Sequence, residues 1–406
     1  MHQPMAGVRM VEVAQFTFTP AAGGVLTEWG ADVIKVEHAE AGDAQRGMVN
    51  HPKDGTFQPL MDHPNRGKRS IGLDLATPGG YEILLELCRD ADVFLTNFLP
   101  SARARLHLDV DDIRKANPDI IYVRGSAHGQ RGPWAEKGGY DGSAFWCRMG
   151  SAWGVTPPDS PRVVTMPAGA YGDSTGGMTI AGGIAAALYG RATTGQTSVV
   201  DVSLMSVGAW AFALDLGNAA LTGASKTPIP LNQTMMNTVG NPTVGHFRTS
   251  DGRWINFTMP QAFRYFADVC RHLGLDHLID DPRFTTAENL RANAADAGQY
   301  IADAIAGNTY AHWNEHLQTM EGPWAPVQNP HDILNDPQMH ANGYLTTLTD
   351  SEGTPRQLVT NPVQFDNTPP HTRRAPLFAE HTDTLLHELG HTDDTIIKLK
   401  IDGAIT

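Results

Sequence analysis

One carboxylate, Asp173, lies in the glycine-rich stretch of residues 167–178, directly before an apolar run of small residues. An Asp at the start of a helix accepts hydrogen bonds from free backbone N–H groups and faces the positive end of the helix dipole, which together hold the carboxylate ionised. An ionised, accessible carboxylate can act as a nucleophile, and the nearby Gly172, Gly176 and Gly177 would let a substrate come close to the backbone. Taken alone, however, the pattern is more typical of an ordinary helix cap, so the rest of the chain decides the role of Asp173.

The same stretch offers a second nucleophile, Ser174. Residues 172–176 match the G-x-S-x-G pattern of serine hydrolases, in which the serine follows directly on a buried strand. Here Pro167 and Gly169 interrupt the preceding residues, which makes a poor central strand. With 41 glycines in the chain, an accidental match is also easy. Serine hydrolysis is therefore the less favoured alternative.

Two further side chains could assist a nucleophilic carboxylate. If Asp141 faces Asp173, it would serve as an acid–base partner or would stabilise a covalent intermediate, although an ordinary turn accounts for Tyr140 and Asp141 equally well. His128 is a weaker candidate, because the chain has 17 dispersed histidines and a typical one lies at the surface or in a loop.

Positive charge is local in this acidic chain. Phosphates prefer the forked guanidinium of Arg and the point charge of Lys, so a few clustered cations would suffice to anchor a nucleotide phosphate. A solvated surface loop is the alternative for the three cations at positions 66–69. The basic residues in question are Arg66, Lys68, Arg69, Arg103, Arg105 and Lys137.

Composition excludes several classes of protein. A net charge of −14 argues against a general nucleic-acid binder. A basic apolar leader and a run of 18 apolar residues are both missing from the sequence, so neither a signal peptide nor a membrane span is expected. The scattered Cys88, Cys147 and Cys270 predict neither disulfides nor a zinc site, which fits a reducing cytoplasm.

The first 130 residues alternate between short β-branched runs and helical stretches. This alternation predicts a mostly parallel, doubly wound sheet of the α/β class. The sequence contains neither G-x-G-x-x-G nor a P-loop, so the sheet need not bind a dinucleotide. The predicted strands are residues 8–13, 31–37, 69–75, 92–96 and 120–124, and the predicted helices are residues 21–29 and 78–88.

A different organisation follows after about residue 225. Residues 245–257 predict a hairpin that turns at 250–252, and three helical stretches follow it. A hairpin with helices indicates a smaller α+β domain. The helical stretches are residues 261–273, 287–304 and 310–320, with further strands expected at 358–360 and 362–365 and a final helix at 379–389.

The motifs in order resemble the family III CoA transferases, the group of formyl-CoA transferase, carnitine CoA transferase and α-methylacyl-CoA racemase. The resemblance implies a Rossmann-like large domain formed by the N- and C-terminal parts, a smaller inserted α+β domain, and an interlocked homodimer. The similar stretches are residues 30–37, 42–43, 65–75, 91–98, 117–122, 129–133, 139–141, 172–178, 280–284, 322–327 and 335–338. The domain boundaries expected from it are 1–200 for the large domain, 201–228 for a linker helix, 229–328 for the small domain and 329–406 for the return segment.

The resemblance also implies a reaction and its participants. Asp173 would be the nucleophile that attacks the thioester of an acyl-CoA, and Asp141 takes the place of an acidic residue near the site of formyl-CoA transferase. Acyl-CoA and a carboxylic acid would be substrates, with no permanently bound cofactor and no metal. The implied CoA contacts are His38, Leu73, Asn97, Arg105, Lys137 and Tyr140, and the implied substrate contacts are Gln15, Thr17, Gly176 and Gly177.

Some positions depart from the relatives. His38 stands where formyl-CoA transferase has an arginine, which weakens a phosphate contact at neutral pH. Thr17 stands where that enzyme has an active-site glutamine, which indicates a different substrate. Racemisation needs two acid–base groups on opposite faces of a carbon, but Tyr140 replaces the racemase histidine, and residues 258–263 lack the opposing glutamate. The sequence therefore favours a CoA transferase over a racemase.

Overall fold

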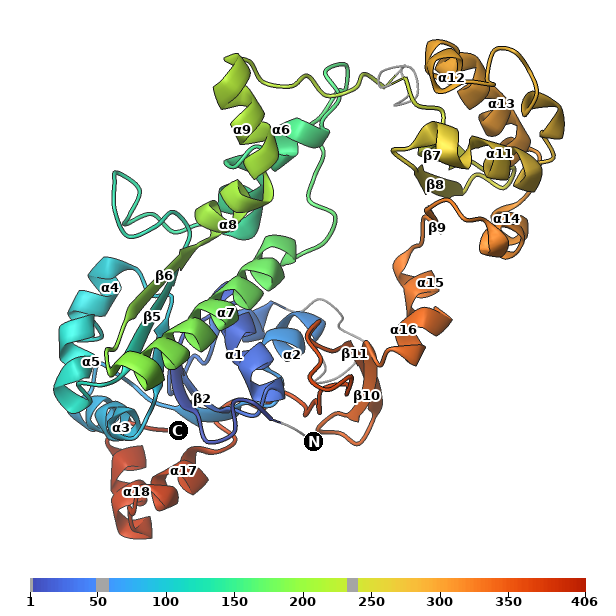
Figure 1. The fold of residues 1–406 in the computed structure, drawn as a ribbon. Helices are drawn as coiled ribbons and strands as arrows, with labels where there is room; N and C mark the ends of the chain where they lie inside the picture. The colour runs from blue at the N-terminus through green and yellow to red at the C-terminus, as the bar shows by residue number, and fades with distance from the viewer. Residues whose placement is uncertain (1–2, 49–57, 232–239) are drawn as a thin grey trace. The chain divides into compact units, whose positions relative to one another are not determined.

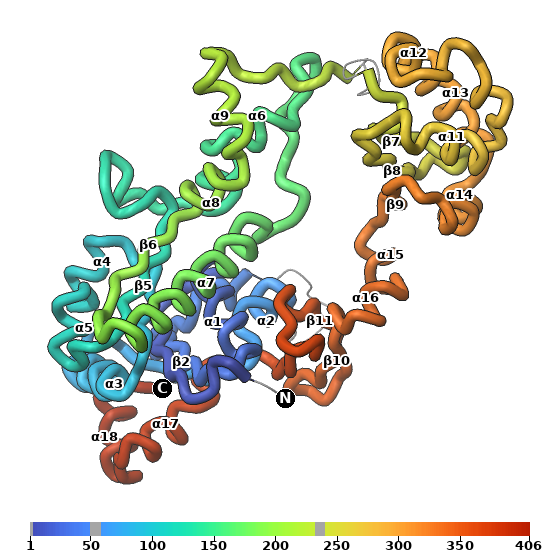
Figure 2. Tube along the Cα trace, viewed as in Figure 1, coloured from blue at the N-terminus to red at the C-terminus, as the bar shows by residue number. Residues whose placement is uncertain are grey.

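The computed structural model describes residues 3–48, 58–231 and 240–406, which form two compact units. A large unit is built from Met1–Gly154, Val164–Lys226 and Pro337–Thr406, and a small unit from Val155–Val163 and Thr227–Asp336 (Figure 1). Figure 2 shows the last segment of the large unit, in red, returning to the blue N-terminal part.

The large unit is organised around a six-stranded sheet in the order β3-β2-β1-β4-β5-β6. Every neighbouring pair is parallel, with Val11 of β1 opposite Ile34 of β2 and Phe94 of β4. This is the doubly wound order in which the chain reverses its direction of travel between β1 and β4. The first five predicted strands are thus confirmed. The strands are β1 (Arg9–Val13), β2 (Asp32–Glu37), β3 (Arg69–Gly72), β4 (Val93–Thr96), β5 (Ile121–Ser126) and β6 (Val199–Ser203).

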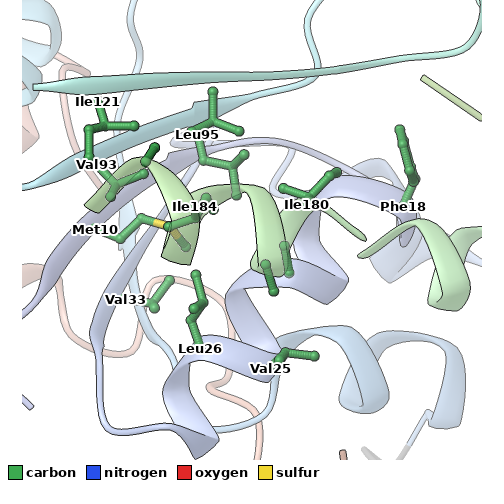
Figure 3. Close-up of a cluster of buried hydrophobic side chains, with 14 of the residues drawn as sticks. Met10, Phe18, Val25, Leu26, Val33, Val93, Leu95, Ile121, Ile180 and Ile184 are labelled. Carbon is green, nitrogen blue, oxygen red and sulfur yellow. The ribbon is translucent and has the colours of Figure 1, made fainter. Parts of the chain in front are cut away.

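Successive strand residues point to opposite sides of the sheet, so apolar side chains lie on both faces. Helices cover both of these faces. On one face, α1 (Phe18–Glu28) and α7 (Tyr171–Thr194) bury Leu26 and Ile184 against Met10 and Leu95 of the strands (Figure 3). The other face is buried by α3 (Pro78–Arg89), α5 (Val110–Ala116), α17 (Thr382–Glu388) and α18 (Asp393–Ile401).

Residues 404–406 close the β3 side of the sheet. The backbone N–H of Asp74 donates to the carbonyl of Ala404 at 2.9 Å, and that of Thr406 to the carbonyl of Gly72 at 3.3 Å. Leu73 and Ile405 form an antiparallel bridge, and both side chains are buried. The edge of the sheet is therefore covered by the chain itself.

Shorter elements complete the large unit. They are α2 (Pro59–Asn65), α4 (Pro100–Arg105), α6 (Ser151–Val155), α8 (Leu204–Ala211), α9 (Ala213–Thr222), α16 (Pro337–Ala341) and the antiparallel pair β10 (Leu345–Thr349) and β11 (Pro355–Val359). The stretch expected to form a linker helix, 201–228, contains two helices, α8 and α9, with a 69° bend between them, and its first residues belong to β6. Within the described part of the chain no single helix meets the length and hydropathy needed to cross a membrane, whereas α8 and α9 taken together do.

Two predictions for the tail need correction. Residues 362–365 do not form a strand, because Asp366 and Asn367 both adopt positive φ in a turn that bridges Phe365 to Thr368. The helix predicted at 379–389 begins only at Thr382 and is followed by α18, which the hydrophobic pattern did not reveal. Strand β11 contains two of the three residues predicted at 358–360.

The small unit pairs a three-stranded antiparallel sheet with helices. The predicted hairpin is confirmed, with Val244 opposite Thr258 and a turn in which Gly252 has a φ of 82°. The helix predicted at 287–304 is interrupted at Asn293 and extends to Ala306. The elements are β7 (Val244–Arg248), β8 (Trp254–Thr258), β9 (Trp324–Pro326), α11 (Ala262–His272), α12 (Ala287–Ala292), α13 (Ala294–Ala306), α14 (Tyr310–His316) and α15 (Pro330–Leu334).

Candidate active site

A cavity of about 780 Å³ opens at the carboxyl ends of β1 and β4. Gln15 follows β1 and Asn97 follows β4, and the two residues are joined by a reciprocal pair of hydrogen bonds. The Gln15 backbone N–H donates to Asn97 Oδ1 at 3.1 Å, and Asn97 Nδ2 donates to the Gln15 carbonyl at 2.7 Å. Ligands of doubly wound sheets bind in the crevice at this topological switch point.

Five of the predicted site residues line this cavity, all of them in the large unit. They are Gln15, Asn97, Arg105, Tyr140 and Asp173. The wall also contains Arg103, whose guanidinium is held by Asp109 at 2.8 Å and by the Phe98 carbonyl at 2.8 Å. Arg105 is exposed, so it is the lining arginine that is available to an anion.

Asp173 occupies the first turn of α7, and its side chain is only 8% exposed. The expectation that Asp173 caps this helix is wrong, because the N-cap is Ala170, in a left-handed conformation with φ 58°. Asp141 performs the capping from a different segment: its Oδ2 accepts the N–H of Gly172 at 3.1 Å, and its Oδ1 accepts that of Gly142 at 2.7 Å. The structure thus places both predicted catalytic carboxyls at the start of one helix.

The charge of Asp173 differs from the sequence expectation. Burial, and secondly the carboxylate of Asp141, raise the pKa of Asp173 from 3.8 to about 7. The carboxylate that was expected to be held ionised by the helix start is therefore only partly ionised near neutral pH, since desolvation outweighs the helix dipole. Once ionised, a poorly solvated carboxylate in a cavity wall is a reactive nucleophile.

A strained residue, Phe16, lies in the same wall. Its φ of 63° is unusual for a residue other than glycine, and its ring packs edge-on against Tyr140 at 5.4 Å between centroids. The backbone N–H of Phe16 donates to Asp43 Oδ1 at 3.1 Å, and Asp43 is paired with the buried Lys35 at 2.8 Å. Lys35 also donates to the Ala14 carbonyl at 2.9 Å. A buried ion pair therefore fixes the conformation of the β1–α1 loop. The sequence did not predict this conformation, because nothing in the sequence marks a Phe that adopts a positive φ.

The basic cluster at positions 66–69 does not face the cavity. Lys68 is buried and donates to Glu12 at 2.7 Å. Arg66 is buried beside Glu28 at 3.1 Å, and Arg69 pairs with Asp32 at 2.6 Å. The interpretation of these residues as a phosphate anchor is wrong, because their charges are paired within the fold.

The remaining predicted CoA contacts lie outside the cavity lining. His38 is exposed and accepts the N–H of Glu40 at 3.2 Å, while Leu73 is buried in the core. Lys137 stacks on Trp134, with its Nζ 4.1 Å from the ring centroid, next to the lining residue Gly138.

The predicted substrate contacts Thr17, Gly176 and Gly177 also lie outside the lining. Thr17 is buried and donates to Gln45 at 2.8 Å. A Cβ at Gly176 would collide with Phe18, and one at Gly177 would lie 2.5 Å from the Cβ of Ala21. Helix α1 fills the room that these two glycines leave, which corrects the expectation that substrate enters there.

The serine alternative gains little from the geometry. The residues before α7 form no strand, so Ser174 does not lie on a nucleophile elbow. Ser174 lines a second cavity together with His63, but no hydrogen bond joins the two described side chains. Burial and the neighbouring Arg66 lower the pKa of His63 to about 4, which makes it a weak general base.

The described residues contain no group of three His, Cys, Asp or Glu side chains able to hold a metal ion. His128 stacks edge-on against Trp134 at 4.9 Å, and burial and Arg148 lower its pKa. His128 lies outside the lining of the cavity that contains Asp173.

Comparisons with known proteins agree with the motifs. The family model described as CoA-transferase family III matches residues 5–382. The (R)-2-hydroxy-4-methylpentanoate CoA-transferase of Clostridioides difficile is 28% identical, covering 98% of each chain. The cinnamoyl-CoA:phenyllactate CoA-transferase of Clostridium sporogenes is 31% identical, covering 98% of this chain and 97% of the relative. The crystal structure of a CaiB/BaiF family protein from Brucella suis superposes with a TM-score of 0.80 at 27% identity, over 96% of this chain and all of that one.

Proposed function

The chain belongs to CoA-transferase family III, and from this premise we propose that it moves CoA from an acyl-CoA to a carboxylic acid through a covalent intermediate on Asp173. The observation that carries the proposal is a buried carboxyl with a pKa of about 7 in the wall of the switch-point cavity. Such a carboxyl is ionised often enough to attack at neutral pH, and it is too poorly solvated to be inert.

The proposed reaction runs in two symmetrical halves. The ionised Asp173 attacks the thioester carbonyl, the C–S bond breaks, and a mixed anhydride and CoA thiolate result. The thiolate then attacks the aspartyl carbonyl of the anhydride, which releases the donor acid and leaves an aspartyl-CoA thioester. The acceptor carboxylate attacks this thioester, the C–S bond breaks, and a second anhydride and CoA thiolate result. The thiolate finally attacks the acceptor's carbonyl, which breaks the anhydride and frees the carboxylate of Asp173. The cycle consumes no net proton and needs no metal.

Other lining residues have proposed roles in holding CoA. Arg105 is the exposed cation for a phosphate, while Asn97 and Tyr140 contact the nucleotide from the ends of β4 and of the loop before the π-helix Gly142–Cys147. Lys137 adds charge beside the cavity. Asp141 keeps the start of α7 in place and raises the pKa of Asp173, so its proposed contribution is positioning and tuning.

A homodimer is proposed from the surface of α8 and α9. Trp210, Leu214 and Leu221 are each more than four-fifths exposed on these short helices, an apolar area typical of a subunit interface. Sedimentation of the protein should give twice the mass of the chain. A monomeric wild-type protein at micromolar concentration would contradict the proposed dimer.

Trapping of the covalent enzyme tests the proposed reaction. The protein is mixed with an acyl-CoA panel and quenched with hydroxylamine, and the peptide that carries Asp173 is analysed by mass spectrometry. We expect a modification on Asp173 in the wild-type protein and in Ser174→Ala, but none in Asp173→Asn. A label on Ser174 would support the hydrolase. Solvent deuterium at the acyl α-carbon without any label would support the racemase, which the absence of a histidine beside Asp141 disfavours.

A further inference from the structure

A second cavity of about 480 Å³ lies within the large unit beside the first turn of α7. Its volume falls within the range of ligand pockets, roughly 300–1,000 Å³. Four segments build its wall: the β1–α1 loop, α2, the start of α7 and β11. The residues that line it include Thr17, Leu60, His63, Ser174, Leu358 and Val359.

Adjacent residues of the same two segments line the two cavities. On α7, Asp173 lines the first cavity, while its neighbour Ser174 lines the second. In the loop after β1, Phe16 and Phe18 line the first cavity, while Thr17 lines the second. A thioester carbonyl held at Asp173 therefore has one cavity for its CoA portion and another for its acyl portion.

The wall of the second cavity is uncharged and largely apolar, with Thr17, Ser174 and Gln357 as its neutral polar members. Leu60, Leu358 and Val359 supply hydrocarbon, and the described lining residues include no Lys, Arg, Asp or Glu. His63 stays neutral at physiological pH, since burial and Arg66 depress its pKa. The guanidinium of Arg66 is itself engaged, by Glu28 at 3.1 Å and by the Val359 carbonyl. A second carboxylate on the substrate would thus meet no cation among the described lining residues, so the cost of its desolvation would not be offset by an opposite charge.

We propose that this second cavity binds the acyl chain of the thioester and selects apolar monocarboxylic acids over dicarboxylic acids. The inference rests on the proposed function and adds the class of substrate to it. The short side chain of Thr17, turned toward Gln45 at 2.8 Å, leaves the entrance beside Asp173 free of a long polar group.

Binding to the full-length Asp173→Asn protein tests the cavity without turnover. Calorimetric titration with acetyl-, butyryl- and hexanoyl-CoA should give an affinity that rises roughly fourfold for each added methylene. Glutaryl-CoA should bind at least about tenfold more weakly than hexanoyl-CoA, because its terminal carboxylate is desolvated without compensation.

A matched pair of substitutions locates the effect. Val359→Phe, added to Asp173→Asn, narrows the cavity from the half-exposed end of β11 and should weaken hexanoyl-CoA binding about tenfold, while acetyl-CoA binding stays unchanged. Val199→Phe makes the same substitution at a half-exposed position of β6 that lines neither cavity, and it should change neither affinity.

Three results would overturn the inference: an affinity that does not depend on chain length, glutaryl-CoA bound as tightly as hexanoyl-CoA, or equal effects of Val359→Phe on all chain lengths. Failure of the wild-type protein to transfer CoA between any two acids, with the chain-length dependence of binding intact, would instead refute the proposed function and leave the cavity assignment standing.

Discussion

Replacing Asp173 by Asn should stabilise the protein, and more so as the pH rises. The folded state raises the pKa of Asp173 from 3.8 to about 7. The folded protein therefore binds this proton more tightly than the unfolded chain, so the carboxyl is neutral at no cost below pH 4 and destabilises the fold as the pH rises toward 7. Each pKa unit is worth about 1.4 kcal/mol, so the full penalty above pH 7 is on the order of 4 kcal/mol. Asn has the shape of the protonated acid and escapes this penalty.

Urea unfolding at fixed protein concentration measures the difference in the free energy of unfolding. The free energy of unfolding of Asp173→Asn should exceed that of the wild-type protein by roughly 2 kcal/mol at pH 5 and by roughly 4 kcal/mol at pH 8. The change between the two pH values is the diagnostic quantity, because it cancels any effect of Asn that does not depend on pH. The control is Ser174→Ala at the next residue of α7, whose hydroxyl does not ionise between pH 5 and 8 and which should show no such trend.

A gap that is the same at both pH values would refute the idea that burial and Asp141 govern the charge of Asp173. A gap that shrinks as the pH rises would show that the helix start dominates instead, with a depressed pKa in the folded state.

Three further predictions concern the rate, the basic residues and the helix packing. The apparent rate constant for CoA release in a single turnover should rise with pH up to about 7 and then level off, because only ionised Asp173 attacks. Asp141→Asn should move the midpoint of this pH profile to lower pH by removing the nearby charge. A rate constant that falls over this pH range would contradict the mechanism. Arg105→Ala should raise the KM for acyl-CoA roughly tenfold with little loss of stability. Lys68→Met should instead lower the free energy of unfolding by about 3 kcal/mol with an unchanged KM, since Lys68 is buried against Glu12. A raised KM in Lys68→Met with an unchanged KM in Arg105→Ala would restore the phosphate-anchor interpretation. Gly177→Ala should lower the free energy of unfolding by about 1–3 kcal/mol by forcing α1 away from α7. Gly182→Ala on the same helix, where a Cβ meets no atom within 4 Å, should raise the free energy of unfolding slightly. Equal effects of the two substitutions in urea titrations would show that the contact with Ala21 is unimportant.

The sheet could be predicted from the sequence because its signal is local. Strands such as Arg9–Val13 and Asp32–Glu37 are short β-branched runs between helical stretches, and each run carries its own evidence. Strand β6 was not predicted, because it leads directly into α8 and a single apolar stretch forms first a strand and then a helix. Helix α18 escaped because its short apolar stripe is flanked by exposed Lys and Asp residues.

The site was less predictable, because its chemistry depends on contacts between distant residues. Asp173 is identified by its motif, but its charge depends on burial in the folded protein and secondly on Asp141, which lies 32 positions earlier in the chain. The spacing of Arg66, Lys68 and Arg69 indicates a basic patch until Glu28, Glu12 and Asp32 are brought against them by the fold. Sequence patterns therefore identified the candidate carboxylate but could not show how strongly the fold raises its pKa.

The bridge between Leu73 and Ile405 has a consequence for synthesis in the cell. The ribosome makes β3 more than three hundred residues before the segment that covers its edge. Until that segment emerges, the nascent chain carries a parallel sheet with an open edge, which is a template for pairing with other chains. The large unit must therefore complete its folding after most of the protein has been translated, and its yield should depend on chaperones that bind nascent chains during this interval.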